Sequence, residues 1–164
     1  MNVDVDPMRS RIMSSVGQKR TKPEMAVRRA LHALGYRFRV NLKGLPGSPD
    51  LVFTKRRKAI FVHGCFWHRH PGCRYASEPK TRREFWQQKF SANIERDARQ
   101  KKELEELGWK VETVWECETR DPDRLIERLR LFLGNPRINR YSPHKIDVGA
   151  AASLSPNGTT SLPS

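Results

Sequence analysis

The sequence predicts an α/β protein in which helices cover a mixed β-sheet. Its 164 residues are enough for one domain with a single hydrophobic core. Periodic segments follow one another as helix, three strands, loop, long helix, strand and helix, an order that fits an α/β sandwich around a mixed sheet. The C-terminal segment is rich in serine, proline, glycine and threonine and has hardly any periodic pattern. We therefore expect a basic arm at residues 1–20, a folded domain at 21–135 and a disordered tail at 136–164.

The first helix is expected at residues 21–34. Pro23 suits the first helical turn, and Gly35 is a typical C-terminal stop. The apolar stripe of this helix consists of Val27, Ala30, Leu31 and Leu34. Glu24 falls in the first turn, where the helix dipole favours a carboxylate. This cap role and a functional role for Glu24 both remain open at this point.

Three strands are expected next, at residues 36–40, 50–53 and 59–62. Asp50 opens the second strand directly after a loop rich in proline and glycine, where a carboxylate is badly placed for core packing. It is therefore either a turn cap or a metal ligand. His63 ends the third strand, and because sequential strands pair more often than not, it should lie within reach of Asp50.

The second half of the chain is expected to form a helix, a strand and a helix. Residues 81–107 have a helical pattern, either continuous or divided by a second N-cap at Ser91. The side chains expected to face the core from this helix are Trp86, Phe90 and Ile94. Residues 109–115 alternate as a strand, and a last helix begins at Asp121-Pro122. The last helix should bury Leu125, Ile126, Leu129, Phe132 and Leu133.

Charge points to the class of partner. The chain has 32 Lys and Arg against 18 Asp and Glu, a net charge of +14. Such an excess predicts an anionic polymer as partner, with nucleic acid the first choice and a membrane surface the second. No apolar run approaches the roughly 20 residues of a membrane span, so we expect a soluble, cytoplasmic protein. The basic turn Lys55-Arg56-Arg57-Lys58 is expected to contact phosphates.

The segment 63–73 predicts a metal site, because it holds three of the five histidines and two of the three cysteines. A tetrahedral zinc ion needs four nitrogen or thiolate ligands. The expected ligands are Cys65, His70, Cys73 and Cys117. His68 is the alternative imidazole, but the spacing Cys-x4-His-x2-Cys closes a tighter loop. Four protein ligands would make this zinc structural, whereas the competing interpretation is three unrelated buried thiols and surface histidines. His63 and His68 would then remain free for chemistry.

Several motifs are the basis for a resemblance to a known family. They are Leu45-Pro-Gly-Ser-Pro-Asp50-Leu-Val, Ile60-Phe-Val-His-Gly-Cys-Phe-Trp-His68, Thr81-Arg-Arg-Glu-Phe-Trp86, Asn93-Ile-Glu-Arg-Asp97, Leu107-Gly-Trp109 and Val114-Trp-Glu-Cys117. Together they resemble the very-short-patch-repair (Vsr) DNA mismatch endonucleases over residues 8–134. The resemblance implies a restriction-endonuclease-like αβα sandwich with a structural zinc ion and catalytic magnesium.

The same resemblance implies a function and a setting. The enzyme would nick one strand of double-stranded DNA at thymine–guanine (T:G) mismatches, such as those left by deamination of 5-methylcytosine. It would work as a monomer near the bacterial nucleoid, with other mismatch-repair proteins as further partners. Two alternatives remain open, a restriction-type or structure-specific nuclease and a catalytically silent zinc-containing DNA-binding module.

The catalytic residues implied by the resemblance begin with the magnesium ligands. Asp50 would hold the ion with the backbone carbonyl of Val62, mostly through water. Most enzymes of this fold carry an acid and a lysine on the next strand, where this chain has Phe61 and His63. Histidines are therefore expected to handle protons, which their pKa near 6.5 suits.

The remaining roles follow from the same resemblance. His68 would activate the attacking water, with Glu24 orienting it. His63 would contact the scissile phosphate or the water shell of the metal, and Asn93 would help to hold that shell.

The DNA contacts implied by the resemblance are a wedge and a base reader. Phe66 and Trp67 would intercalate, and Met13 would insert from the opposite groove. Lys89, which can only donate hydrogen bonds, would read the carbonyl acceptors of the wobble pair. The alternatives are core packing for the three wedge residues and a phosphate contact for Lys89.

Overall fold

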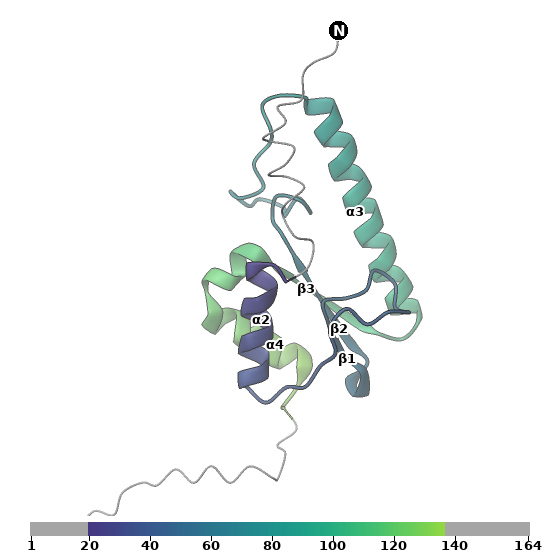
Figure 1. Ribbon diagram of the computed structural model, residues 1–164, viewed down its shortest axis with the longest axis vertical. Helices are drawn as coiled ribbons and strands as arrows, with labels where there is room; N and C mark the ends of the chain where they lie inside the picture. The colour runs from purple at the N-terminus through teal and green to yellow at the C-terminus, as the bar shows by residue number, and fades with distance from the viewer. Residues whose placement is uncertain (1–19, 137–164) are drawn as a thin grey trace, which may run out of the picture.

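The computed structural model describes residues 20–136 and contains a mixed three-stranded sheet with three α-helices (Figure 1). The elements in chain order are α2 (Lys22–Ala33), β1 (Leu51–Phe53), η1 (Thr54–Arg56), β2 (Lys58–His63), α3 (Arg83–Glu106), β3 (Lys110–Trp115), η2 (Glu116–Arg120) and α4 (Pro122–Leu133). In the sheet β2 is central, antiparallel to β1 and parallel to β3. The expected α/β class with a mixed sheet is confirmed. The expected arm, including Met13, and the tail beyond Pro136 lie outside the described residues.

Helix α2 begins where its sequence places the start. The Thr21 hydroxyl accepts a hydrogen bond from the Glu24 N–H at 3.4 Å, and the Glu24 carboxylate accepts one from the Thr21 N–H at 3.2 Å. This reciprocal capping box satisfies two donors that would otherwise have no partner. Gly35 follows the helix with φ +87°, a left-handed conformation that favours glycine. The cap role expected for Glu24 is thus present.

Strands β1 and β2 form the hairpin that positions the site. Leu51 pairs with Ile60 and Phe53 with Lys58, so the start of β1 and the end of β2 lie at the same end of the sheet. The backbone N–H of Val62 donates a hydrogen bond to Asp50 Oδ2 at 2.7 Å. The expected pairing of these strands is therefore confirmed.

The strand expected at residues 36–40 is wrong. Only Arg39 bridges Val52, through two backbone hydrogen bonds of 2.9 and 2.8 Å. Asn41 then adopts φ +46°, and this left-handed turn directs the chain away from β1 before a second pair can form. Tyr36 nonetheless packs in the core, with its hydroxyl bonded to the Gly134 carbonyl at 2.6 Å.

Helix α3 connects the parallel strands β2 and β3 as one continuous element of 24 residues, with no break at Ser91. Its N-terminal half extends past the ends of the strands (Figure 1). Phe90 is buried and Trp86 half-buried, but Ile94 is 47% exposed, so the expected core position of Ile94 is wrong. The helical period placed the three side chains on one face, but that face is only partly covered.

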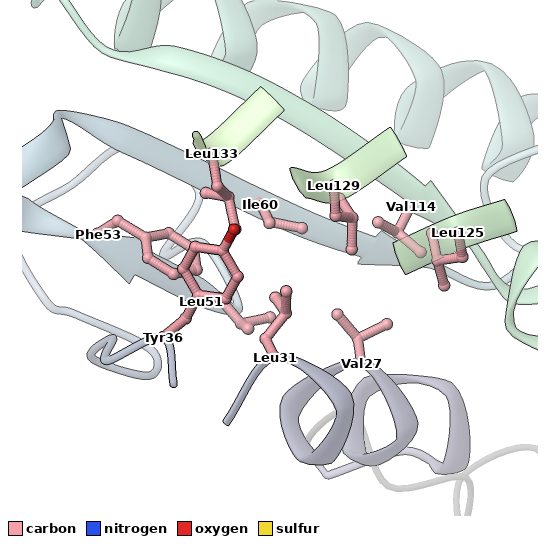
Figure 2. Close-up of a cluster of buried hydrophobic side chains, with 10 residues drawn as sticks. All are labelled: Val27, Leu31, Tyr36, Leu51, Phe53, Ile60, Val114, Leu125, Leu129 and Leu133. Carbon is pink, nitrogen blue, oxygen red and sulfur yellow. The ribbon is translucent and has the colours of Figure 1, made fainter. Parts of the chain in front are cut away.

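The hydrophobic core lies between the sheet and the helix pair α2 and α4, as Figure 2 shows. It consists of Val27, Leu31, Tyr36, Leu51, Phe53, Ile60, Val114, Leu125, Leu129 and Leu133. Of the residues expected to be buried in α4, Ile126 and Phe132 are only half-buried. The helix therefore presents a narrower apolar face to the sheet than expected, made of the buried residues Leu125, Leu129 and Leu133, which are four residues apart.

The basic turn has a structural role that the sequence did not predict, while its expected phosphate contact stays a prediction. Arg56 donates to the carbonyls of Leu133 and Asn135 at 2.7 and 2.6 Å, and Lys58 donates to that of Phe132 at 2.6 Å. Arg57 donates in the same way to Gly108 at 3.3 Å and to Leu107. Cations at helix C-termini satisfy carbonyls that have no partner within the helix. The turn thus fastens the ends of α3 and α4 to the hairpin, at the opposite end of the strands from Asp50 and His63.

Candidate active site and metal-binding loop

Asp50 lies at the end of the sheet in a poorly solvated position. Burial raises its pKa to about 6, opposed by the hydrogen bond from Val62 and reinforced by the charge of Glu24. Arg28 and His68 act on the Asp50 carboxylate with the opposite sign, so all these groups lie within electrostatic range of it. A carboxylate with so little compensating positive charge is suited to receive a cation.

His63 and His68 form a stacked pair beside this carboxylate. Their ring centroids are 3.8 Å apart and the ring planes differ by 9°. Burial, followed by the charge of His68, lowers the pKa of His63 to about 4. His63 is therefore neutral at neutral pH, and the stack does not hold two positive charges.

Asp97 is a site residue that the sequence reasoning did not assign. Its Oδ2 makes a short contact with Nδ1 of His68. Burial acts to raise the pKa of Asp97, but the hydrogen bond and charge of His68 hold it below its usual value. The available signal was its position one helical turn after Asn93 in the motif on α3.

His63, His68 and Asp97 are close enough together to be considered as metal ligands. The lone pair of an imidazole lies in the ring plane, and the two rings here are stacked in parallel. Their lone pairs therefore do not converge on one ion, and Asp97 already occupies Nδ1 of His68. This geometry favours proton handling over metal binding for the trio.

Glu24 is brought to the same region by the first turn of α2. It is only 2% exposed, it is ion-paired with Arg28, and its charge raises the pKa of Asp50. Arg28 was also not predicted. The Nε atom of Arg28 is buried without a hydrogen-bond partner within residues 20–136. Two carboxylates and one arginine thus meet at the edge of the site.

Asn93 is tied to the loop that carries the histidines. Its side-chain amide donates to the Trp67 carbonyl at 3.0 Å and so fixes the loop against α3. The role expected for Asn93, holding the water shell of a metal, stays a prediction.

The predicted cysteine and histidine ligands come together in space. The ligand atoms of Cys65, His70, Cys73 and Cys117 all lie within 4.8 Å of one another. His70 Nδ1 is 3.7 Å from the Cys65 sulfur and 3.3 Å from the Cys117 sulfur. Burial raises the pKa of Cys65 to about 12, so ionisation of this thiol needs a cation nearby. The group is therefore able to hold a metal ion.

Trp115, at the end of β3, connects the two groups. The His70 ring stacks on the Trp115 ring with centroids 4.3 Å apart, while the His63 and Trp115 rings pack edge to face with centroids 5.6 Å apart. The Cys/His group and the histidine pair therefore share one rigid aromatic support.

Phe66 and Trp67 belong to a separate aromatic cluster outside the main core. The Phe66 ring packs edge to face against the rings of Trp67, Trp86 and Phe90, with ring centroids 5.2, 5.7 and 5.3 Å apart. Phe66 and Trp67 are both half-buried, and Lys89 Nζ lies 5.4 Å from the centre of the Trp67 ring. The structure thus brings three of the four predicted DNA-contacting residues together, and their roles stay predictions.

Comparisons with known proteins identify the class. The family model described as DNA mismatch endonuclease Vsr matches residues 2–74. A protein named Type II nicking enzyme V.XorIIP, from Xanthomonas oryzae, is 50% identical over 130 residues, which cover 79% of this chain and 95% of the relative. The DNA mismatch endonuclease Vsr of Escherichia coli is 43% identical over 119 residues, covering 73% and 76%. These relatives are endonucleases, and the protein is an endonuclease.

The family follows from the extent of these matches. Type II nicking enzyme V.NmeAIP from Neisseria meningitidis is also 43% identical, over 121 residues that cover 74% of this chain and 86% of the relative. The chain belongs to the Vsr family of DNA mismatch endonucleases. Within residues 20–136, no helix has the length and apolar character that crossing a membrane requires.

Proposed function

We propose that this protein is a magnesium-dependent endonuclease that nicks one strand of double-stranded DNA at T:G mismatches, as left by deamination of 5-methylcytosine. The observation that carries the proposal is the arrangement of Asp50 beside the stacked pair His63 and His68 at the end of a mixed sheet. It lies in a chain of net charge +14 whose relatives are named as mismatch endonucleases and nicking enzymes.

Asp50 and the backbone carbonyl of Val62 would hold magnesium, with water completing the ligand set. The pKa of about 6 supports this assignment, because it marks a carboxylate that lacks compensating charge. The hydrogen bond from Val62 uses Oδ2 of Asp50 and leaves Oδ1 for a cation. When bound, magnesium would supply positive charge that stabilises the charge developing on the scissile phosphate.

His68 would take the proton of the attacking water. Its contact with Asp97 through Nδ1 fixes the tautomer that carries a proton there, which leaves the Nε2 lone pair free as the base. Asp97 also stabilises the ring once it has accepted the proton. His63, neutral because its pKa is about 4, would contact the scissile phosphate or a metal-bound water. Glu24 would orient the water, and Asn93 would hold the surrounding shell.

We infer that the ion held by the Cys/His group is zinc and that it is structural. Zinc–sulfur and zinc–nitrogen bonds of about 2.3 and 2.0 Å place neighbouring tetrahedral ligands roughly 3.6 Å apart. The separations of 3.7 and 3.3 Å in this group fit that geometry. Four protein ligands leave no open position for water, so this ion would shape the loop.

The aromatic cluster supports the wedge assignment. Phe66 and Trp67 would enter the base stack from one groove and Met13 from the other, because a mismatched step costs less to unstack. Lys89 Nζ lies 5.4 Å from the centre of the Trp67 ring, so a base pair next to the inserted ring would be within its reach, and Lys89 would read the wobble pair there. The cluster packs against α3 rather than in the main core, which favours DNA contact.

The remaining expectations complete the proposal. The helices and sheet would form a restriction-endonuclease-like αβα sandwich, with α3 covering the face opposite to α2 and α4. The enzyme would act as a monomer in the bacterial cytoplasm, associated with the nucleoid and with other mismatch-repair proteins.

The test is a nicking assay on three duplexes that are identical except for one position, which is paired, carries T:G or carries another mismatch. We expect magnesium-dependent cleavage of one strand of the T:G duplex only. Asp50→Asn should abolish cleavage, whereas Asp123→Asn, at an exposed carboxylate on α4, should not change it. Equal cleavage of the paired duplex would favour a restriction-type nuclease, and binding without cleavage by the unmodified protein would favour a silent DNA-binding module.

A further inference from the structure

Two arginines and a tyrosine form a cluster beside the Cys/His group. Arg74 and Arg120 lie 4.8 and 4.5 Å from the centre of the Tyr75 ring, measured from each guanidinium carbon. Arg74 also donates a hydrogen bond to the Tyr75 hydroxyl at 2.7 Å. Both arginines are exposed and Tyr75 is half-buried. The three residues therefore present two positive charges to solvent on one aromatic support.

Neither guanidinium is neutralised within residues 20–136. No carboxylate there lies within salt-bridge distance of Arg74 or Arg120, although Arg69 and Arg128 nearby in the sequence are ion-paired. Two like charges on one ring repel each other, and no internal acid offsets that repulsion. An arginine pair of this kind is suited to bind an external anion bidentately.

The backbone of the cluster is held in place by the Cys/His group and by a hydrogen bond from Arg69. Arg74 directly follows Cys73, and Arg120 comes three residues after Cys117, so two of the metal-binding cysteines bring the arginines together. The residue that follows Tyr75 in the chain is also held, because Arg69 donates a hydrogen bond to the carbonyl of Ala76 at 2.8 Å. The backbone on both sides of the cluster is thus set before any ligand arrives, and the contacts of both guanidinium groups with Tyr75 keep them close together, which lowers the entropy cost of binding.

We propose that Arg74, Tyr75 and Arg120 form a clamp for backbone phosphates of the DNA on which the enzyme acts. The choice of DNA rests on the proposed function, but the clamp does not depend on the mismatch preference. The clamp adds affinity without sequence choice, because phosphates are the same at every step. Unlike Arg56 and Arg57, which donate hydrogen bonds to carbonyls at helix ends, Arg74 and Arg120 have no such structural partner within residues 20–136.

The experiment measures binding of the zinc-loaded full chain to paired and T:G duplexes, without added magnesium, at several salt concentrations. The slope of log K against log salt is negative, and each lost phosphate contact reduces its magnitude by about 0.9. This reduction corresponds to about eightfold weaker binding at 0.1 M salt. We expect this change for Arg74→Ala and for Arg120→Ala, on both duplexes, and about twice the slope change for the double variant. Arg74→Lys should keep most of the slope, and Arg130→Ala, at an exposed arginine near the end of α4, should keep all of it.

Unchanged slopes in both alanine variants would overturn the clamp. Loss of zinc from those variants, measured on the same samples by atomic emission, would also overturn it, because the cluster would then be structural. A change confined to the T:G duplex would contradict phosphate binding and indicate base reading. If the unmodified protein shows no mismatch preference but the variants still lower the slope, the proposed substrate is wrong and the clamp stands.

Discussion

Asp50→Asn is predicted to inactivate the enzyme and to stabilise its fold. The pKa of Asp50 is raised from 3.8 to about 6 by burial. A raised pKa means that the folded state holds the proton more tightly than the unfolded state does. The stability associated with the protonated form is therefore complete below about pH 4 and is lost as the pH rises through about 6. Asparagine keeps the acceptor for the Val62 N–H but carries no charge, so it avoids this loss.

The magnitude follows from the shift. At about 1.36 kcal/mol per pKa unit, the variant should be more stable than the unmodified protein by about 1.5 kcal/mol at pH 5 and about 3 kcal/mol at pH 7.5. His63 acts with the opposite sign, because burial lowers its pKa from 6.5 to about 4 and its neutral form is favoured in the fold. The stability that the neutral His63 contributes is lost as the pH falls from about 6.5 to about 4. His63→Asn, which takes up no proton, should therefore gain stability relative to the unmodified protein as the pH is lowered.

The assay is urea unfolding of zinc-loaded protein at pH 5, 6 and 7.5 without magnesium, followed by tryptophan fluorescence. Asp123→Asn, at an exposed carboxylate, is the control and should show no such rise with pH. Adding magnesium at pH 7.5 should stabilise the unmodified protein and not Asp50→Asn. An Asp50→Asn variant that is less stable than the unmodified protein, or a difference that does not grow with pH, would refute the reasoning.

Three further variants test the other parts of the site. Cys117→Ser should lose zinc and unfold or become markedly less stable, as measured by zinc content and circular dichroism, and full stability without zinc would contradict the site. Trp67→Ala should reduce the preference for T:G over paired DNA more than it reduces affinity for paired DNA, and an unchanged preference would favour a packing role. Asp97→Asn should slow single-turnover nicking at least about 100-fold with DNA affinity unchanged, and a near-normal rate would argue against His68 as the base.

Local sequence signals were sufficient for the elements that build the site. Thr21, Pro23 and Glu24 placed the start of α2, because capping uses residues three apart in the chain. The hairpin of β1 and β2 placed Asp50 near His63, since consecutive strands pair. The spacing of Cys65, His70 and Cys73 is a local pattern within one loop, whereas Cys117, 52 residues from Cys65, was predicted because a tetrahedral zinc ion needs a fourth ligand.

The differences from the predictions arose where tertiary context decides. The face of α3 that carries Ile94 has a helical period, but how far the helix extends past the sheet is not encoded in that period. The run of arginine and lysine at residues 55–58 did not predict the hydrogen bonds of Arg56 and Arg57 to carbonyls at helix ends, because those carbonyls lie far away in the sequence. Asp97 gained its role from a partner 29 residues away in the sequence, a contact that no local pattern reports.

The most direct test of the central claim measures the rate of single-strand nicking of a duplex with one T:G pair as magnesium is added to zinc-loaded protein. We predict no nicking before magnesium, a saturable rise in the unmodified protein, and no rise in Asp50→Asn with its zinc content unchanged. Nicking by Asp50→Asn at the normal rate, or nicking that needs no magnesium, would contradict the assignment of catalysis to the carboxylate and histidines beside the Cys/His group.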